Sequence, residues 1–162
     1  MNMTLPATIA PPRRRSVKPR PLMPLSAVEW RLDRHEYEVI TMIEEGELLW
    51  AFDVRAPKAS HAELRVLTQS VQDYLAGRCS LADKDEDADW QRVARLIFPD
   101  QPSIVTGELT RSLSCGRQHA INLVYGRQFR LVPGSAIRPG PGGSPRLETA
   151  SVAGWLRKRR VL

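Results

Sequence analysis

Apolar and polar positions along residues 25–77 follow two different periods, and each period predicts a kind of element. Apolar side chains three and four residues apart are typical of one face of a helix, whereas alternation at every second residue is typical of a half-buried strand. We therefore expect, in chain order, helices over 25–32 and 34–45, strands over 48–54 and 63–67, and a helix over 68–75. Asp33 is suited to cap the second helix, and Gly46 and Gly77 are suited to end the second and last helices.

The second half of the chain is expected to repeat this order of elements. In chain order they are helices over 106–113 and 114–125, a strand over 129–132, a glycine- and proline-rich loop over 133–145, a strand over 146–148 and a helix over 151–159. A shift of 81 residues aligns the two halves. RVLTQSVQDYL at 65–75 then matches RLETASVAGWL at 146–156 in five of eleven positions. One offset shared by several elements favours an internal duplication over a chance likeness of amphipathic helices.

Two other segments differ from these halves in composition. Residues 1–24 are rich in proline and carry five basic and no acidic side chains, which predicts a disordered basic arm. In the acidic residues 78–103, Trp90, Val93 and Ile97 have helical spacing, which predicts a linker helix over 88–98. The expected organisation is an arm (1–24), an acidic repeat (25–77), an acidic linker (78–103) and a basic repeat (104–162).

The charge of the chain, +6 in total, is distributed unevenly. Residues 25–77 hold five basic and ten acidic side chains, whereas residues 104–162 hold ten basic and two acidic ones. Basic blocks favour a polyanionic partner, because each phosphate contact releases condensed counterions; a solvated basic surface is the alternative. No stretch approaches the roughly 20 apolar residues of a membrane helix, and the N-terminus lacks a secretory pattern. A cytoplasmic protein without a membrane partner is expected.

The order of the predicted elements and a few sequence words resemble a known family. SLSCGRQHAINLVYGRQFRLV at 112–132 is similar to the turn, recognition helix and first wing strand of excisionase and MerR-type winged helix-turn-helix domains, and ETASVAGWL at 148–156 to their closing segment. In the first repeat the matching words are RHEYEVITMIEEGEL and VLTQSVQDYL. The resemblance implies an α+β, mainly α fold of two tandem winged helix-turn-helix domains joined by a linker helix. Two features depart from the family pattern. At the offset of 81 residues Gly46 corresponds to position 127, so Gly126 lies one residue early, and the second wing is unusually long and glycine-rich.

This resemblance implies which residues contact DNA. A recognition helix presents its N-terminal residues to base edges, and Arg suits guanine while Gln and Asn suit adenine. The expected base-reading residues are Arg117, Gln118, His119 and Asn122. The expected contacts to the DNA backbone or minor groove are Arg111, Arg130, Arg138, Arg146, Arg157, Lys158, Arg159 and Arg160, with Arg13, Arg14 and Arg15 of the arm.

The equivalent face of the first repeat is chemically different. Glu36 and Glu38 would stand where phosphates or bases approach, so this repeat is expected to bind DNA weakly or to contact a protein through Tyr37 and Glu38. Trp50 and Phe52 could belong to that contact surface, although packing in the core is the more common role of such residues.

No residue pattern predicts an enzyme, a cofactor or a metal site. The acidic run at 83–89 lacks the glycine and the terminal glutamate of a calcium loop, and Cys79 and Cys115 lack zinc or disulfide spacing. We expect a non-catalytic protein that binds double-stranded DNA, also as an oligomer, as an excisionase-like architectural factor or transcription regulator of a bacterial, phage or mobile element. The alternative is an adaptor that docks an integrase or other recombinase, a polymerase or a replication protein through the acidic repeat. RNA binding is a third and weaker alternative.

Overall fold

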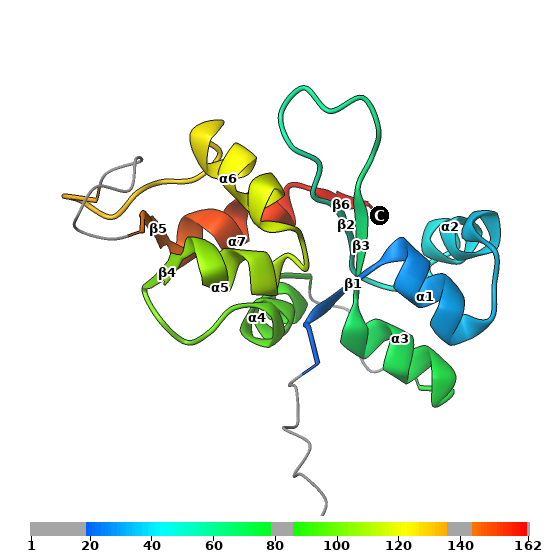
Figure 1. Ribbon diagram of the computed structural model, residues 1–162. Helices are drawn as coiled ribbons and strands as arrows, with labels where there is room; N and C mark the ends of the chain where they lie inside the picture. Colours follow the sequence, from blue (N-terminus) through cyan, green and yellow to red (C-terminus); the bar gives the residue numbers. More distant parts are fainter. Residues whose placement is uncertain (1–18, 79–85, 136–143, 162) are drawn as a thin grey trace, which may run out of the picture.

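The computed structural model describes residues 19–78, 86–135 and 144–161 of the chain, and within them it forms a mixed α+β fold (Figure 1). A first unit, residues 22–75, contains β1 (Leu22–Pro24), α1 (Leu25–Leu32), α2 (Glu36–Glu44), β2 (Ala51–Asp53), β3 (Leu64–Leu67) and α3 (Thr68–Leu75). A second unit, residues 103–157, contains β4 (Ser103–Val105), α5 (Thr106–Ser112), α6 (Arg117–Tyr125), β5 (Arg146–Glu148) and α7 (Thr149–Arg157). Between the units lies α4 (Glu86–Ile97), and β6 (Arg160–Val161) follows the second unit.

The strands and turns of the two units correspond at an offset of 81 residues. In the β1–β3 pair Met23 lies opposite Val66, and in the β4–β5 pair Ile104 lies opposite Leu147, which is the same register. The α1–α2 and α5–α6 turns each contain a left-handed residue at the same place, Asp33 (φ 53°) and Ser114 (φ 50°). The two units therefore share one local backbone path, and the mixed α+β class expected from the sequence is confirmed.

The second helix of each unit begins later than the sequence predicted. Asp33 at the end of α1 and Ser114, one residue after the C-cap of α5, are left-handed, so neither caps the following helix, and α2 and α6 begin at residues 36 and 117. At the start of α2, the backbone N–H of His35 donates to Glu38 Oε2 at 2.9 Å, which satisfies one of the unpaired donors of the first turn. At the start of α6 the backbone of Gly116 takes the equivalent extended conformation.

The C-terminal segment forms a strand of the first unit's sheet, whereas the sequence predicted a helix as far as residue 159. The four-stranded sheet has the order β1-β3-β2-β6, and Ala51 of β2 lies opposite Val161 of β6. The backbone N–H of Asp53 also donates to the carbonyl of Arg159 at 2.9 Å. Helix α7 ends at Arg157 because the chain then pairs with the open edge of β2.

The two units share one hydrophobic core. Its largest cluster joins Trp50 and Phe52 of the first unit, Trp90 of α4 and Leu109 and Leu123 of the second unit. The ring of Trp90 lies 6.0 Å from that of Trp50 and 6.2 Å from that of Phe52. A smaller cluster under α1 and α2 belongs mainly to the first unit. Trp50 and Phe52 are 3% and 0% exposed and thus core residues, and α4 packs between the units as part of that core.

Candidate nucleic-acid interface

The exposed face of α6 carries three of the four residues that the sequence suggested for base reading. Arg117, Gln118 and Asn122 are all exposed. Gln118 and Asn122 lie one helical turn apart, and Gln118 Nε2 donates to Asn122 Oδ1 at 3.1 Å. No acidic residue lies in the first turn of this helix. The face therefore offers one cation and two amide groups, each able to make paired hydrogen bonds with a flat, edge-on partner.

The turn that precedes α6 is held by the first unit. Arg65 of β3 is 8% exposed, and its Nε donates to the carbonyl of Ser114 at 3.1 Å. The Nη2 of Arg65 pairs with Glu63 Oε1 at 2.5 Å, so the guanidinium is compensated where it is buried. Arg20 Nη1 adds a contact of 3.5 Å to the hydroxyl of Ser114. Buried contacts of this kind fix the direction in which α6 leaves the turn.

His119, the fourth residue suggested for base reading, lies in the contact between the units. Its side chain is 16% exposed. Its Nε2 is 2.7 Å from the carbonyl oxygen of Val54, and its Nδ1 is 3.0 Å from Glu63 Oε2. Because both ring nitrogens have partners in the first unit, the structure separates His119 from the open face of α6. The side chain ties the first turn of α6 to the β2–β3 loop.

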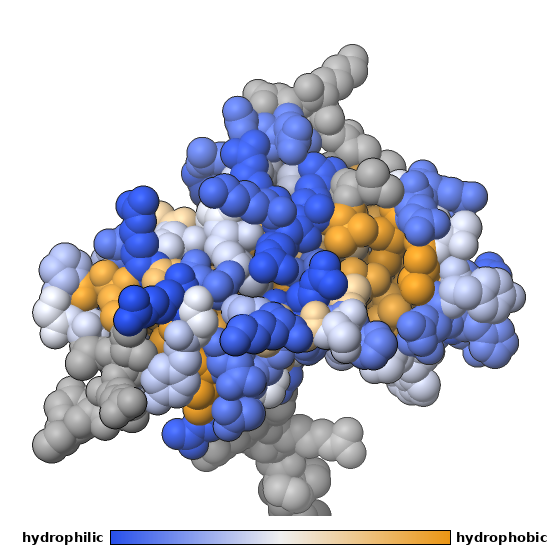
Figure 2. Space-filling model, turned by 90° about the horizontal axis from the view of Figure 1, so that it is seen from above, coloured by the Kyte–Doolittle hydropathy of each residue, from blue (hydrophilic) through white to orange (hydrophobic). Residues whose placement is uncertain are grey.

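The β2–β3 loop of the first unit lies against the end of α6. A Cβ atom placed on Gly126 would lie 2.8 Å from Cγ of Pro57, which is closer than real Cβ atoms approach. Seen from above, hydrophilic side chains cross the middle of this face, where α6 and the loop lie, between two more apolar areas (Figure 2). One side of α6 is thus covered by the first unit, and the side with Arg117, Gln118 and Asn122 is open.

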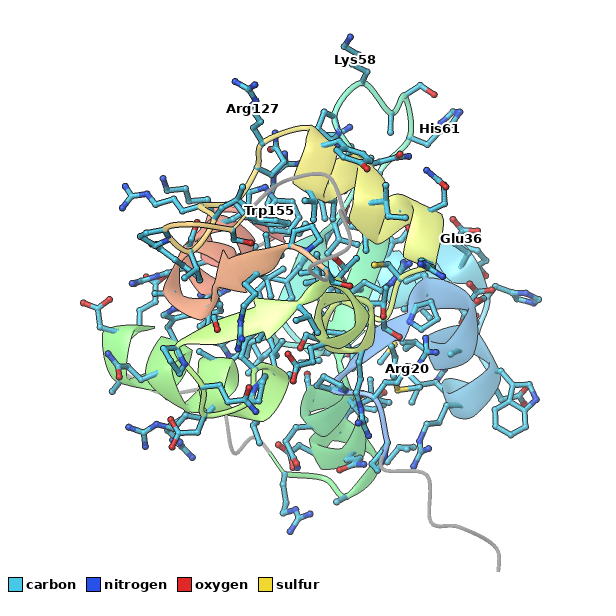
Figure 3. The ribbon with its side chains drawn as sticks, turned by 60° about the vertical axis from the view of Figure 1, so that its left-hand side comes forward. Arg20, Glu36, Lys58, His61, Arg127 and Trp155 are labelled. Carbon is cyan, nitrogen blue, oxygen red and sulfur yellow. The ribbon has the colours of Figure 1, made fainter. Side chains whose placement is uncertain are left out.

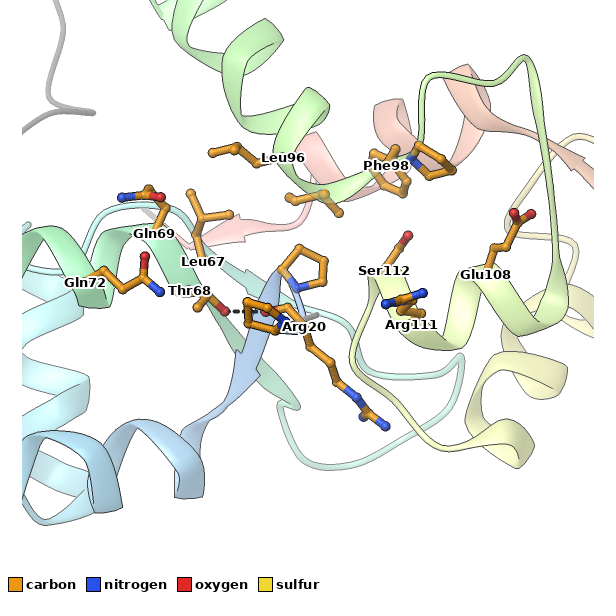
Figure 4. Close-up of a pocket in the computed structure, with 14 residues that line it drawn as sticks. Arg20, Leu67, Thr68, Gln69, Gln72, Leu96, Phe98, Glu108, Arg111 and Ser112 are labelled. Atoms are coloured by element: carbon orange, nitrogen blue, oxygen red, sulfur yellow. Dashed lines mark hydrogen bonds between the residues drawn. The ribbon is translucent and has the colours of Figure 1, made fainter. Parts of the chain in front are cut away.

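The residues suggested for backbone contacts do not form one surface. Arg130 and Arg146 are both exposed and flank the bridge between Leu131 and Leu147 in the second unit. Lys158 is exposed just after α7. Arg111 instead lines a cavity of about 460 Å³ between α3, α4 and α5 (Figure 4), whereas α6 lies at the top of the molecule in Figure 1. Arg13, Arg14, Arg15 and Arg138 lie outside the described residues.

Three arginines at the C-terminal end have partners within the chain. Arg157 pairs with Asp87, and Arg160 Nη1 lies 3.4 Å from Glu86 Oε1, so two carboxylates in the first turn of α4 partly neutralise this basic segment. The guanidinium of Arg160 also lies 3.9 Å from the centre of the Trp50 ring, and that of Arg159 lies 5.2 Å from the Trp155 ring. These contacts give the three arginines a role in holding α4 and β6 to the core.

The equivalent face of α2 carries acidic and aromatic groups. Tyr37 is 68% exposed, and its ring is stacked on that of His35 with a centroid distance of 6.1 Å. Glu38 accepts a hydrogen bond from the backbone N–H of His35 and pairs with Arg34 at 3.1 Å. The hydrogen bond from His35 is the main cause that lowers the pKa of Glu38. Glu38 is thus engaged in its own helix start, and Tyr37 is the more available of the two residues suggested for a protein contact.

Several residues of this region carry no signal in the sequence. Arg65, which anchors the turn before α6, reads in the sequence as one more charge of a strand. Lys58 and Arg127 have backbone φ angles of 70° and 52°, which are unusual for residues with a side chain. In the first unit the position of Arg127 is occupied by Gly46, with a φ of 76°. The glycine at the equivalent position of the first repeat was the signal in the sequence that pointed to a left-handed backbone at Arg127.

No protein-family model, curated protein or solved structure matches this chain. Among the described residues there is no group of three or more His, Cys, Asp and Glu side chains that could hold a metal ion. No helix in the described ranges combines the length and the apolar character needed to cross a membrane.

Proposed function

We propose that this protein binds double-stranded DNA without catalysing a reaction, and that the open face of α6 reads bases in the major groove. The observation that carries the proposal is the joint exposure of Arg117, Gln118 and Asn122 on a helix whose preceding turn is fixed by Arg65. Side chains held on a rigid element lose less freedom on binding, which favours specific recognition. In this role the protein is an excisionase-like architectural factor or a transcription regulator.

The arrangement of the second unit supports a winged helix-turn-helix interpretation. Helix α5 and the turn at Ser114 support α6, and the chain then runs through the Leu131–Leu147 bridge into β5 and α7. In the proposal the residues between Leu131 and β5 are the wing, and Arg130 and Arg146 at its base contact phosphates. Base contacts would give the sequence preference, and phosphate contacts would give most of the affinity. The first unit then is a second copy of the same domain with an acidic recognition face.

The experiment is a selection of bound fragments from the source genome, followed by footprinting of the enriched site at about 0.15 M salt. We expect a protected site that wild-type protein prefers over random duplex, and we expect Arg117→Ala to lose this preference while it keeps residual non-specific binding. Lys158→Ala, which removes an exposed charge that is not part of α6, serves as the control and should weaken binding to all sequences equally. Equal binding of every duplex by the wild-type protein would contradict the proposal.

A second candidate function is a protein contact through the first unit. Trp30 is 86% exposed and Tyr37 is 68% exposed, and these residue types are common among those that dominate protein interfaces. In this alternative the partner is a DNA-processing protein, such as a recombinase, and the acidic groups around Tyr37 contact basic side chains on it. Tyr37→Ala would then abolish activity in the cell while DNA affinity stays unchanged. Loss of activity on Arg117→Ala alone would exclude this alternative as the main function.

A further inference from the structure

Two turns from different units meet beside the end of α6, and each carries a basic side chain. In the β2–β3 loop the backbone N–H of Ala59 donates to the carbonyl of Ala56 at 3.1 Å, which places Lys58 at the third position of a tight turn. The turn after α6 contains Arg127. The two turns touch at Pro57 and Gly126. In Figure 3, Lys58 and Arg127 both point outward along the upper edge of the molecule.

Both basic residues hold a backbone conformation that glycine adopts more readily. The φ of Lys58 is 70°, at a turn position that calls for a positive φ and therefore for glycine or asparagine. The φ of Arg127 is 52°, where the first unit has Gly46. Left-handed residues with side chains cost free energy, persist where the surrounding structure holds them, and are common at functional sites. The strained backbone therefore points to a use for the two charges.

The neighbouring charges leave this pair of cations uncompensated. Within the described residues neither Lys58 nor Arg127 takes part in an ion pair, and both side chains are exposed. The nearby carboxylates have other partners. Asp53 pairs with Arg55 at 2.8 Å, and Glu63 pairs with Arg65 and His119. An anion that approaches this edge thus meets two positive charges held by two touching turns.

We propose that Lys58 of the first unit and Arg127 of the second unit together bind phosphates of a DNA backbone, as a phosphate clamp beside α6. This inference rests on the proposed function and extends it, because it gives the acidic first unit a direct contact with DNA through its β2–β3 loop. The contact is independent of sequence, since phosphates are the same at every step of a duplex. The intact chain is required, because the two cations come from different units.

The test measures binding of the full chain to a labelled random-sequence duplex DNA over a range of salt concentrations. The variants are Lys58→Gly, Arg127→Gly and the double variant, since glycine fits both backbone conformations and should keep or raise the melting temperature. We expect each glycine variant to lower the slope of log affinity against log salt by about 0.9, and the double variant by about twice that amount. Arg95→Ala on α4, at the opposite end of the molecule, is the matched control for the loss of one charge.

The outcomes separate the clamp from the proposed function. If Arg117→Ala loses the preference for the selected site while both glycine variants keep the wild-type salt slope, the clamp is wrong and the proposed function stands. If wild-type protein does not bind duplex DNA at all, both are wrong. If Arg95→Ala lowered the salt slope by the same amount, the effect would come from the net charge of the protein and the clamp would be wrong. Tighter binding of single-stranded RNA, with the same response to the glycine variants, would overturn the assignment to DNA.

Discussion

The two units correspond in strand register and in the turn between their first two helices, and they differ in surface charge. At equivalent positions of the second helix, Glu36 of the first unit corresponds to Arg117 of the second, and Thr41 corresponds to Asn122. The register of the paired strands and the left-handed turns correspond as well. Buried positions and turns therefore specify the shared path, and the exposed face of the second helix is free to differ in charge.

The units also differ in what covers them. The turn before α6 is covered by Arg65 of the first unit and by Arg20, which precedes that unit, whereas the residues of the turn before α2 are exposed. The position of exposed Arg34 in the first unit corresponds to buried Cys115 in the second. The difference shows that the units are not equivalent in the assembled fold. The first unit supports the second, and the second presents the basic helix.

The largest expected effect comes from the core that joins the units. Phe52→Ala should lower the free energy of unfolding by about 3–5 kcal/mol, because it removes a fully buried aromatic ring that packs against both Trp50 and Trp90. Thermal unfolding followed by circular dichroism and by amide hydrogen exchange should show both units destabilised in one transition. A variant in which only residues of the first unit lose protection would show that the units unfold independently.

A smaller effect is expected at the contact that His119 makes with the first unit. His119→Ala should lower the free energy of unfolding by about 1–3 kcal/mol, because it leaves the Val54 carbonyl and the Glu63 carboxylate without this partner in a partly buried contact. Glu38→Ala at the equivalent position of α2 is the control, and it should have a smaller effect because Glu38 contacts only its own unit. If denaturant titrations showed that both variants lose the same free energy of unfolding, His119 would not stabilise the contact between the units more than Glu38 stabilises its own helix.

Copying the face of α6 onto α2 should raise DNA affinity. The triple change Glu36→Arg, Tyr37→Gln and Thr41→Asn gives the first unit the groups of Arg117, Gln118 and Asn122. Because it replaces a negative with a positive charge, the slope of log affinity against log salt should steepen by about 0.9 if one new phosphate contact forms. Binding to duplex DNA over a salt series measures the change. An unchanged slope would mean that α2 cannot reach DNA even when its chemistry is suitable.

The smallest effect concerns the covered turn of the second unit. Burial raises the pKa of the Cys115 thiol to about 11 from 9.0. Since the unfolded chain ionises first as the pH rises, stability should be unaffected below pH 9 and should fall between about pH 9 and about pH 11. In Cys115→Ala, this part of the pH dependence of the melting temperature should vanish. A wild-type profile that matches the variant's over this range would show that the turn is open in solution.

Sequence patterns predicted the helices of both units and the strands β2, β3 and β5, because those elements depend on local spacing of apolar residues and on glycine at helix ends. The strand expected over 129–132 is wrong in extent, because only Leu131 pairs there, in an isolated bridge to Leu147. The short strands β1, β4 and β6 were not predicted, since two or three residues are too few to show a period. The pairing of β6 with β2 depends on contacts between residues more than 100 positions apart in the chain. No local signal encodes such a contact.

The candidate site was predictable in part for the same reason. Arg117, Gln118 and Asn122 follow from helical spacing, because one helix face is a local property. His119 has the same spacing, and only the packing of the β2–β3 loop against α6 decides that its ring faces the first unit. The partners of Arg157 and Arg160 lie on α4, 70 and 74 residues earlier, so their pairing with Asp87 and Glu86 was not visible in the charge pattern.

The most direct test of the account compares the same two positions in both units. Wild-type protein, Arg117→Ala/Asn122→Ala and Glu36→Ala/Thr41→Ala are titrated in parallel with the duplex that genomic selection enriches. We predict that the α6 variant loses about 1–3 kcal/mol of binding free energy for each base contact removed. The α2 variant should bind as tightly as wild type, or more tightly because a carboxylate is gone. Equal losses in both variants, or a loss confined to the α2 variant, would contradict the assignment of DNA reading to the second unit.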